Sequence, residues 1–119
     1  MPSAAALTVY CFGATSLLAG LHNLLLPSRA LATLDLPSAC ACASNGLALA
    51  AIAMGVYYPL AAFQENIAFF LMTIPMRSLT AAVFWSYGTA AWRLPAAWEG
   101  LGALATAVAL IWGRRRQTR

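Results

Sequence analysis

Four long apolar segments, separated by short polar breaks, make up nearly the whole chain. They run over residues 5–26, 43–63, 67–87 and 95–113. Each has about 20 residues, the length at which an α-helix crosses the ~30 Å hydrocarbon core of a bilayer. The pattern therefore predicts an all-α membrane protein, in which residues 1–119 form a single bundle of four transmembrane helices with short loops.

Proline and polar residues mark the three breaks. The first reads LPSRALATLDLPS, the second is the short turn QEN, and the third is GTAAWRLP. Pro95 closes the third break, and proline suits the first turn of a helix because its missing N–H is not needed there. We therefore expect the fourth helix to begin at Pro95.

The composition agrees with a membrane location, since 62% of the residues are hydrophobic and only 8% are charged. A soluble domain of this size needs more surface charge. All seven basic residues are arginine, and four of them lie in the last six positions. This basic run directly follows an apolar segment, which is typical of an anchor at the membrane edge and argues against nucleic acid as a partner.

The arginines also predict the topology. An even number of spans puts both termini on one side, and the C-terminal arginine cluster makes that side the cytosol. The apolar run at the N-terminus has no basic residues before it and continues to Leu26, so we interpret it as a retained span. The expected location is a multi-pass position in a membrane, which would be the endoplasmic reticulum in a eukaryotic cell.

Small and polar residues recur at helical spacing along every segment. Helices in lipid approach closely along such stripes, because packing rather than a hydrophobic force holds them together. We expect the stripes to form the seams of the bundle. They comprise Gly13, Ser16 and Gly20; Ala48, Ala51, Gly55, Tyr58 and Ala62; Asn66, Thr73, Arg77, Thr80 or Ala81, Phe84 and Gly88; and Glu99, Gly102, Thr106, Ala109 and Gly113.

Arg77 is the sharpest signal, because it lies near the middle of the third segment. An arginine at the bilayer centre costs roughly 2.5–3.5 kcal/mol on insertion scales, so it should face the bundle interior. Pro75 should free a backbone carbonyl and kink the helix beside it. We expect the arginine side chain to extend outward and to pair with Glu99 of the fourth segment.

Other polar residues, in the half of the bundle that faces away from the cytosol, are expected to join this pair. Four helices would then contribute to one polar cluster, as is usual for sites in helix bundles. In this hypothesis His22 and Glu99 act as acid and base and Arg77 polarises the substrate. The substrate would be bound by Asn23, Asn45, Trp85, Tyr87 and Trp98.

Each candidate also has a simpler explanation. His22 and Asn23 can be interfacial residues at a helix end, and Asn45 can be an N-cap or make an inter-helix hydrogen bond. A carboxylate in the first turns of a helix, such as Glu99, is favoured by the helix dipole. The pair with Arg77 can be purely structural, and the aromatic residues can form an interfacial belt.

The chain has no pattern typical of a bound cofactor or metal. Its three cysteines are odd in number, and Cys40 and Cys42 are too close in sequence for an easy disulfide. With one histidine and no second cysteine pair, zinc binding is disfavoured. We interpret Cys11, Cys40 and Cys42 as small apolar residues, and we expect no cofactor and no metal.

The stretches SNGLALAAIAMGVYYPLAAF, ENIAFFLMTIPMRSLTAAVFW and WEGLGALATAVAL carry a resemblance. They are similar to small four-helix integral membrane proteins of bacteria and fungi that are distantly DoxX-like. Where those proteins often carry an acidic residue in the third span, this chain has Arg77 and Ser78. The resemblance implies a four-helix fold and, as for fungal members, an accessory or tailoring role in small-molecule biosynthesis. It transfers no site residues.

Three functions remain open on the sequence. The first is a membrane-embedded biosynthetic enzyme or enzyme subunit, which isomerises or cyclises a lipophilic small molecule that enters from the bilayer. The second is a non-catalytic scaffold or accessory subunit, assembled with itself or with other membrane proteins. The third, a small transporter, ranks last because the first span lacks the buried acidic residue on which small multidrug transporters rely.

Overall fold

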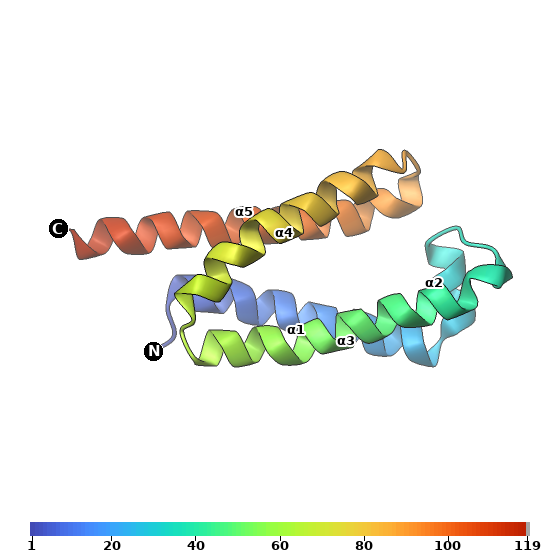
Figure 1. The fold of residues 1–119 in the computed structure, drawn as a ribbon, viewed down its shortest axis with the longest axis horizontal. Helices are drawn as coiled ribbons and strands as arrows, with labels where there is room; N and C mark the ends of the chain where they lie inside the picture. Colours follow the sequence, from blue (N-terminus) through green and yellow to red (C-terminus); the bar gives the residue numbers. More distant parts are fainter. Residues whose placement is uncertain (119) are drawn as a thin grey trace.

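Residues 1–118, the part of the chain that this computed structural model describes, form four long helices (Figure 1). These are α1 (Ala4–Leu25), α3 (Ala41–Phe63), α4 (Ile67–Ser86) and α5 (Ala90–Gln117), and no strand occurs among the described residues. All four are long and apolar enough to cross a membrane. The predicted all-α fold, a membrane bundle of four helices, is confirmed.

The connections differ from the prediction in two places. The first break is partly helical, with α2 (Pro27–Thr33) and a single 3-10 turn, η1 (Ser38–Cys40). The fourth helix begins at Ala90, so the predicted start at Pro95 is wrong. Thr89 has extended backbone angles and precedes the helix. Pro95 lies inside α5, where it lacks the N–H that would otherwise bond to the Ala91 carbonyl.

The bundle is built from two helix pairs. α1 packs along α3 and α4 packs along α5, while α1 and α5 join the two pairs. Figure 1 shows the pairs lying apart at the end where α2 is found, and α5 running past the other helices at its C-terminus. The molecule measures 55 × 27 × 16 Å along its principal axes, so it is elongated and flattened. Much of its helical surface therefore faces the surroundings.

The α1–α3 seam confirms the stripes of small residues predicted for these two helices. A Cβ atom added at Gly55 would stand 2.7 Å from the Cα and 2.8 Å from the nitrogen of Leu17. One turn away, the Ser16 hydroxyl donates a 2.7 Å hydrogen bond to the Ala51 carbonyl. The two backbones are in contact, as expected where packing holds helices together in lipid.

The N-terminus is tied to the turn between α3 and α4. The Ser3 backbone N–H and hydroxyl each donate a 2.7 Å hydrogen bond to the Glu65 carboxylate, one to each oxygen. The Ser3 hydroxyl also accepts a hydrogen bond from the Ala6 N–H and so caps α1. The Ser3–Glu65 pair therefore joins the start of the first helix to the turn between α3 and α4.

This contact predicts a pH dependence. The hydrogen bonds from the side chain and backbone of Ser3 lower the pKa of Glu65 below its ordinary value of 4.5. A depressed pKa stabilises the folded form above the unfolded pKa, and this stabilisation is lost as pH falls through the folded pKa. We expect amide exchange in the first turn of α1, corrected for intrinsic rate, to accelerate below pH ~4. Glu65→Gln should exchange fast at every pH, whereas Asp35→Asn should behave as wild type.

Candidate functional site

Arg77 is buried in the middle of α4, with only 2% of its surface exposed. Its Nη2 atom donates a 2.7 Å hydrogen bond to the Thr106 hydroxyl of α5 and a 3.3 Å bond to Thr73, one turn earlier on α4. Thr106 in turn shares a 2.9 Å hydrogen bond with Thr8 of α1. A line of hydroxyl groups thus holds one side of the guanidinium.

Aromatic rings hold the other side of the guanidinium. Its central carbon lies 4.2 Å from the centre of the Phe12 ring of α1 and 5.9 Å from that of Tyr58 of α3. The Phe12 ring also stacks on the indole of Trp98, with 4.3 Å between the ring centres and 13° between the ring planes. A cation over a desolvated ring is worth about 2 kcal/mol. All four long helices therefore contribute to the surroundings of Arg77.

Three polar atoms at this site have no hydrogen-bond partner among the described residues. They are Nε and Nη1 of Arg77 and Oε2 of Glu99, a residue that is itself only 6% exposed. The two charges attract each other, but no hydrogen bond joins them. Buried polar groups in native proteins nearly always have a partner, and in a membrane each unpaired one costs several kcal/mol.

The expected outward extension of Arg77 toward Glu99 is wrong. Side chains on a helix point back toward its N-terminus, and Arg77 follows this rule, since it reaches Thr73 in the preceding turn of α4. Nη1 of Arg77 packs against Gly102 of α5. Glu99 lies about one turn before Gly102, nearer to the start of α5, whereas the Arg77 side chain points away from that end. The charges are neighbours without direct contact.

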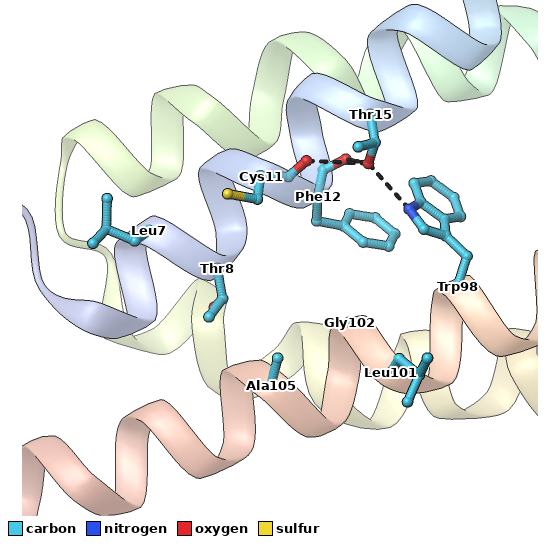
Figure 2. A pocket seen from close by; sticks show the side chains of 9 residues that line it. All are labelled: Leu7, Thr8, Cys11, Phe12, Thr15, Trp98, Leu101, Gly102 and Ala105. Atoms are coloured by element: carbon cyan, nitrogen blue, oxygen red, sulfur yellow. Dashed lines mark hydrogen bonds between the residues drawn. The ribbon is translucent and has the colours of Figure 1, made fainter.

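A groove between α1 and α5 runs beside this site (Figure 2). The groove is shallow and open to the surroundings, and its volume is about 420 Å³. The indole N–H of Trp98 donates a 3.0 Å hydrogen bond to the Thr15 hydroxyl and so bridges the two helices at one end. The groove is lined by Leu7, Thr8, Cys11, Phe12, Thr15, Trp98, Leu101, Gly102 and Ala105.

The remaining polar residues of the predicted site lie elsewhere. His22 is exposed near the end of α1, where its Nδ1 lies 3.3 Å from the side-chain oxygen of Asn23. Ten residues separate His22 from Phe12, or about 15 Å along the helix. Asn45 is half-buried inside α3 and is not its N-cap, because Cys40 occupies that position. The structure does not bring His22 and Glu99 together as an acid–base pair.

The three aromatic residues that were predicted to bind the substrate are divided between two places. Trp98 belongs to the site through its contact with Phe12. Trp85 and Tyr87 are exposed near the α4–α5 turn, where the guanidinium of Arg93 lies 5.4 Å from the Trp85 ring and Trp92 packs at 5.0 Å on Tyr87. Their surroundings match the alternative interpretation as an interfacial belt.

Comparisons with known proteins add no assignment: no protein-family model, no curated protein and no solved structure matches the chain. The resemblance to DoxX-like membrane proteins therefore stays a prediction. A function for this chain has to be argued from the arrangement of its own residues.

Proposed function

We propose that this multi-pass membrane protein is a biosynthetic enzyme, or the catalytic subunit of one, that isomerises or cyclises a lipophilic small molecule at the Arg77–Glu99 site. The observation that carries the proposal is the set of three unpaired polar atoms, two donors on Arg77 and one acceptor on Glu99, within one buried cluster of the described residues. A bound molecule could pair with all three if it supplied an acceptor for the two Arg77 donors and a donor for the Glu99 oxygen. Lipid chains cannot do so.

The two residues have complementary chemistry for such a reaction. The free Nε–H and Nη1–H groups of Arg77 can stabilise negative charge that develops on a carbonyl oxygen. The Glu99 carboxylate can remove a proton from the carbon next to that carbonyl and return it to another carbon. Such a proton shift needs no further reactant. Because His22 is remote, Glu99 performs both proton transfers in this proposal.

An accessory or scaffold role is the second candidate, and a separate observation favours it. Within the most apolar 18-residue stretch of the α3 segment, only 17% is buried inside the molecule, and the same share is buried in α4. Helices of partner membrane proteins, or of a second copy, could cover these faces in addition to lipid. In that case Arg77 and Glu99 would only position the helices.

Metabolite profiling of the source organism separates the two functions. The gene would be deleted and then complemented with wild type, Arg77→Gln, Glu99→Gln or Arg93→Gln at matched levels of membrane protein. We expect a metabolite that disappears on deletion to return with wild type and with Arg93→Gln, which removes an exposed charge outside the site. Its level should stay at least 100-fold lower with either site variant, because loss of one such group costs about 10²–10³ in rate.

The opposite result supports the scaffold role. If both site variants restore the metabolite at normal abundance, the unpaired polar atoms take no part in the reaction and the proposed enzyme function is wrong.

A further inference from the structure

We infer that the molecule bound at Arg77 lies along the α1–α5 groove and presents a carbonyl or carboxyl oxygen to Nη1 of Arg77 beside Gly102. This inference rests on the proposed function, since it names the route and the chemical class of the ligand of the same site. It adds a binding surface on α1 and α5 that the reaction chemistry alone does not require.

The groove and the guanidinium meet at Gly102. A Cβ atom added there would stand 2.7 Å from Nη1 of Arg77 and 2.8 Å from Cδ2 of Phe12. Glycine inside a helix costs about 1 kcal/mol relative to alanine. Because Gly102 has no side chain, the unpaired Nη1 of Arg77 packs closely against α5 at the edge of the groove. Arg77 itself is buried and does not line the groove.

The lining of the groove defines the ligand. Its side chains are almost all apolar, and the hydroxyl groups of Thr8 and Thr15 already donate to backbone carbonyls of α1. A guanidinium has hydrogen-bond donors and no acceptor. The ligand therefore needs an apolar chain for the groove and, at one end, an oxygen that accepts hydrogen bonds.

Phe12 lies between the groove and Arg77. Its ring covers the guanidinium at 4.2 Å, lines the groove and is held by stacking on Trp98 at 4.3 Å. Figure 2 shows this ring between the two helices, directed from α1 toward α5. In this inference the Phe12 side chain turns aside, the ligand oxygen then reaches Nη1, and the apolar chain of the ligand occupies the groove.

Photolabelling in lipid nanodiscs tests this inference. Three probes would share a 16-carbon chain with a central diazirine, and would be a carboxylic acid, its methyl ester and an alkane. We expect the acid, the ester or both to label peptides of the groove, with displacement by excess palmitic acid or methyl palmitate. The acid alone would indicate a carboxylate ligand, and equal labelling by the ester would indicate that a carbonyl oxygen suffices. The alkane should label lipid-facing helices evenly.

Matched variants locate the labelling. Gly102→Ala should lower groove labelling at least fivefold, whereas Gly100→Ala should leave it unchanged, because its Cβ would meet only the Ala81 side chain at 3.6 Å. If Gly102→Ala does not fold, Cys11→Phe fills the groove from its exposed side on α1, with Cys42→Phe as control. Even labelling of all helices by the acid and ester, or labelling unaffected by both groove variants, would overturn the inference.

Failure of this inference differs from failure of the proposed function. If labelling ignores the groove variants while Arg77→Gln and Glu99→Gln still abolish the metabolite, the function stands and the route through the groove is wrong. If labelling follows Gly102 while both charge variants restore the metabolite, the groove binds the lipophile without the proposed reaction.

Discussion

Replacing Gly55 by leucine is expected to prevent α1 and α3 from packing. Even the first carbon of a side chain at Gly55 would stand 2.7 Å from the Leu17 Cα, which is backbone and cannot turn aside. Overpacking a core usually costs about 1–3 kcal/mol, and a contact with backbone should lie at or above the upper end of this range. We expect a large fall in thermal stability in detergent, or loss of monodisperse protein in gel filtration.

Gly46→Leu is the matched control, because it makes the same change on the same helix. Outside its own stretch of helix, no atom of residues 1–118 lies within 4 Å of a Cβ added at Gly46. Leucine has a higher helix propensity than glycine, so this variant should be as stable as wild type or slightly more stable. Equal stability of the Gly55→Leu variant and wild type would show that the α1–α3 seam is not closely packed.

Removing both charges of the site is expected to leave the protein at least as stable as wild type. In the Arg77→Met/Glu99→Met double variant, methionine fills most of the space of each charged side chain with a flexible apolar chain. Replacing buried charges by apolar groups is often neutral or stabilising by about 1–4 kcal/mol. Loss of the Thr106 hydrogen bond and the Phe12 contact offsets part of this gain. The measurement is the unfolding midpoint in one detergent.

The single variants complete this experiment. Arg77→Met alone leaves the Glu99 carboxylate without its neighbouring cation, so it should be less stable than the double variant. A double variant that is less stable than wild type by about 3 kcal/mol or more would mean that the two charges hold the helices together. That result would favour the scaffold role, whereas retained stability with lost activity is expected of a functional site.

Much of the fold could be predicted because it follows from length, hydropathy and small residues. The four spans could be recognised from runs of about 20 apolar residues alone. The spacing of Gly55 with Ala48 and Ala51 was sufficient to predict a packing seam on α3, although not that α1 is its partner. The start of α5 was missed because proline is common in the first turn of a helix, and residues 90–94 were therefore assigned to the loop although none of them breaks a helix.

The site was less predictable, because side-chain direction and helix order decide it. The sequence indicated that Arg77 is buried and that Thr106 and Gly102 share a face of the fourth helix. It contained no sign that Arg77 would turn toward Thr106 rather than toward Glu99. Phe12 was missed altogether, since one aromatic residue in an apolar span has no distinguishing pattern. His22 and Asn45 were assigned to the site by depth alone, which does not determine position around the bundle.

The length of α5 has a consequence for the leaflet from which a ligand is drawn. The last turns of this helix carry Arg114, Arg115 and Arg116, and arginines at the end of a span settle among lipid headgroups. Thr106, which binds the guanidinium of Arg77, precedes Arg114 by eight residues, or about 12 Å of helix. Half of the hydrocarbon core is about 15 Å thick. We therefore expect α5 to hold the guanidinium on the arginine side of the bilayer midplane, where lipophiles dissolved in that leaflet can reach the site.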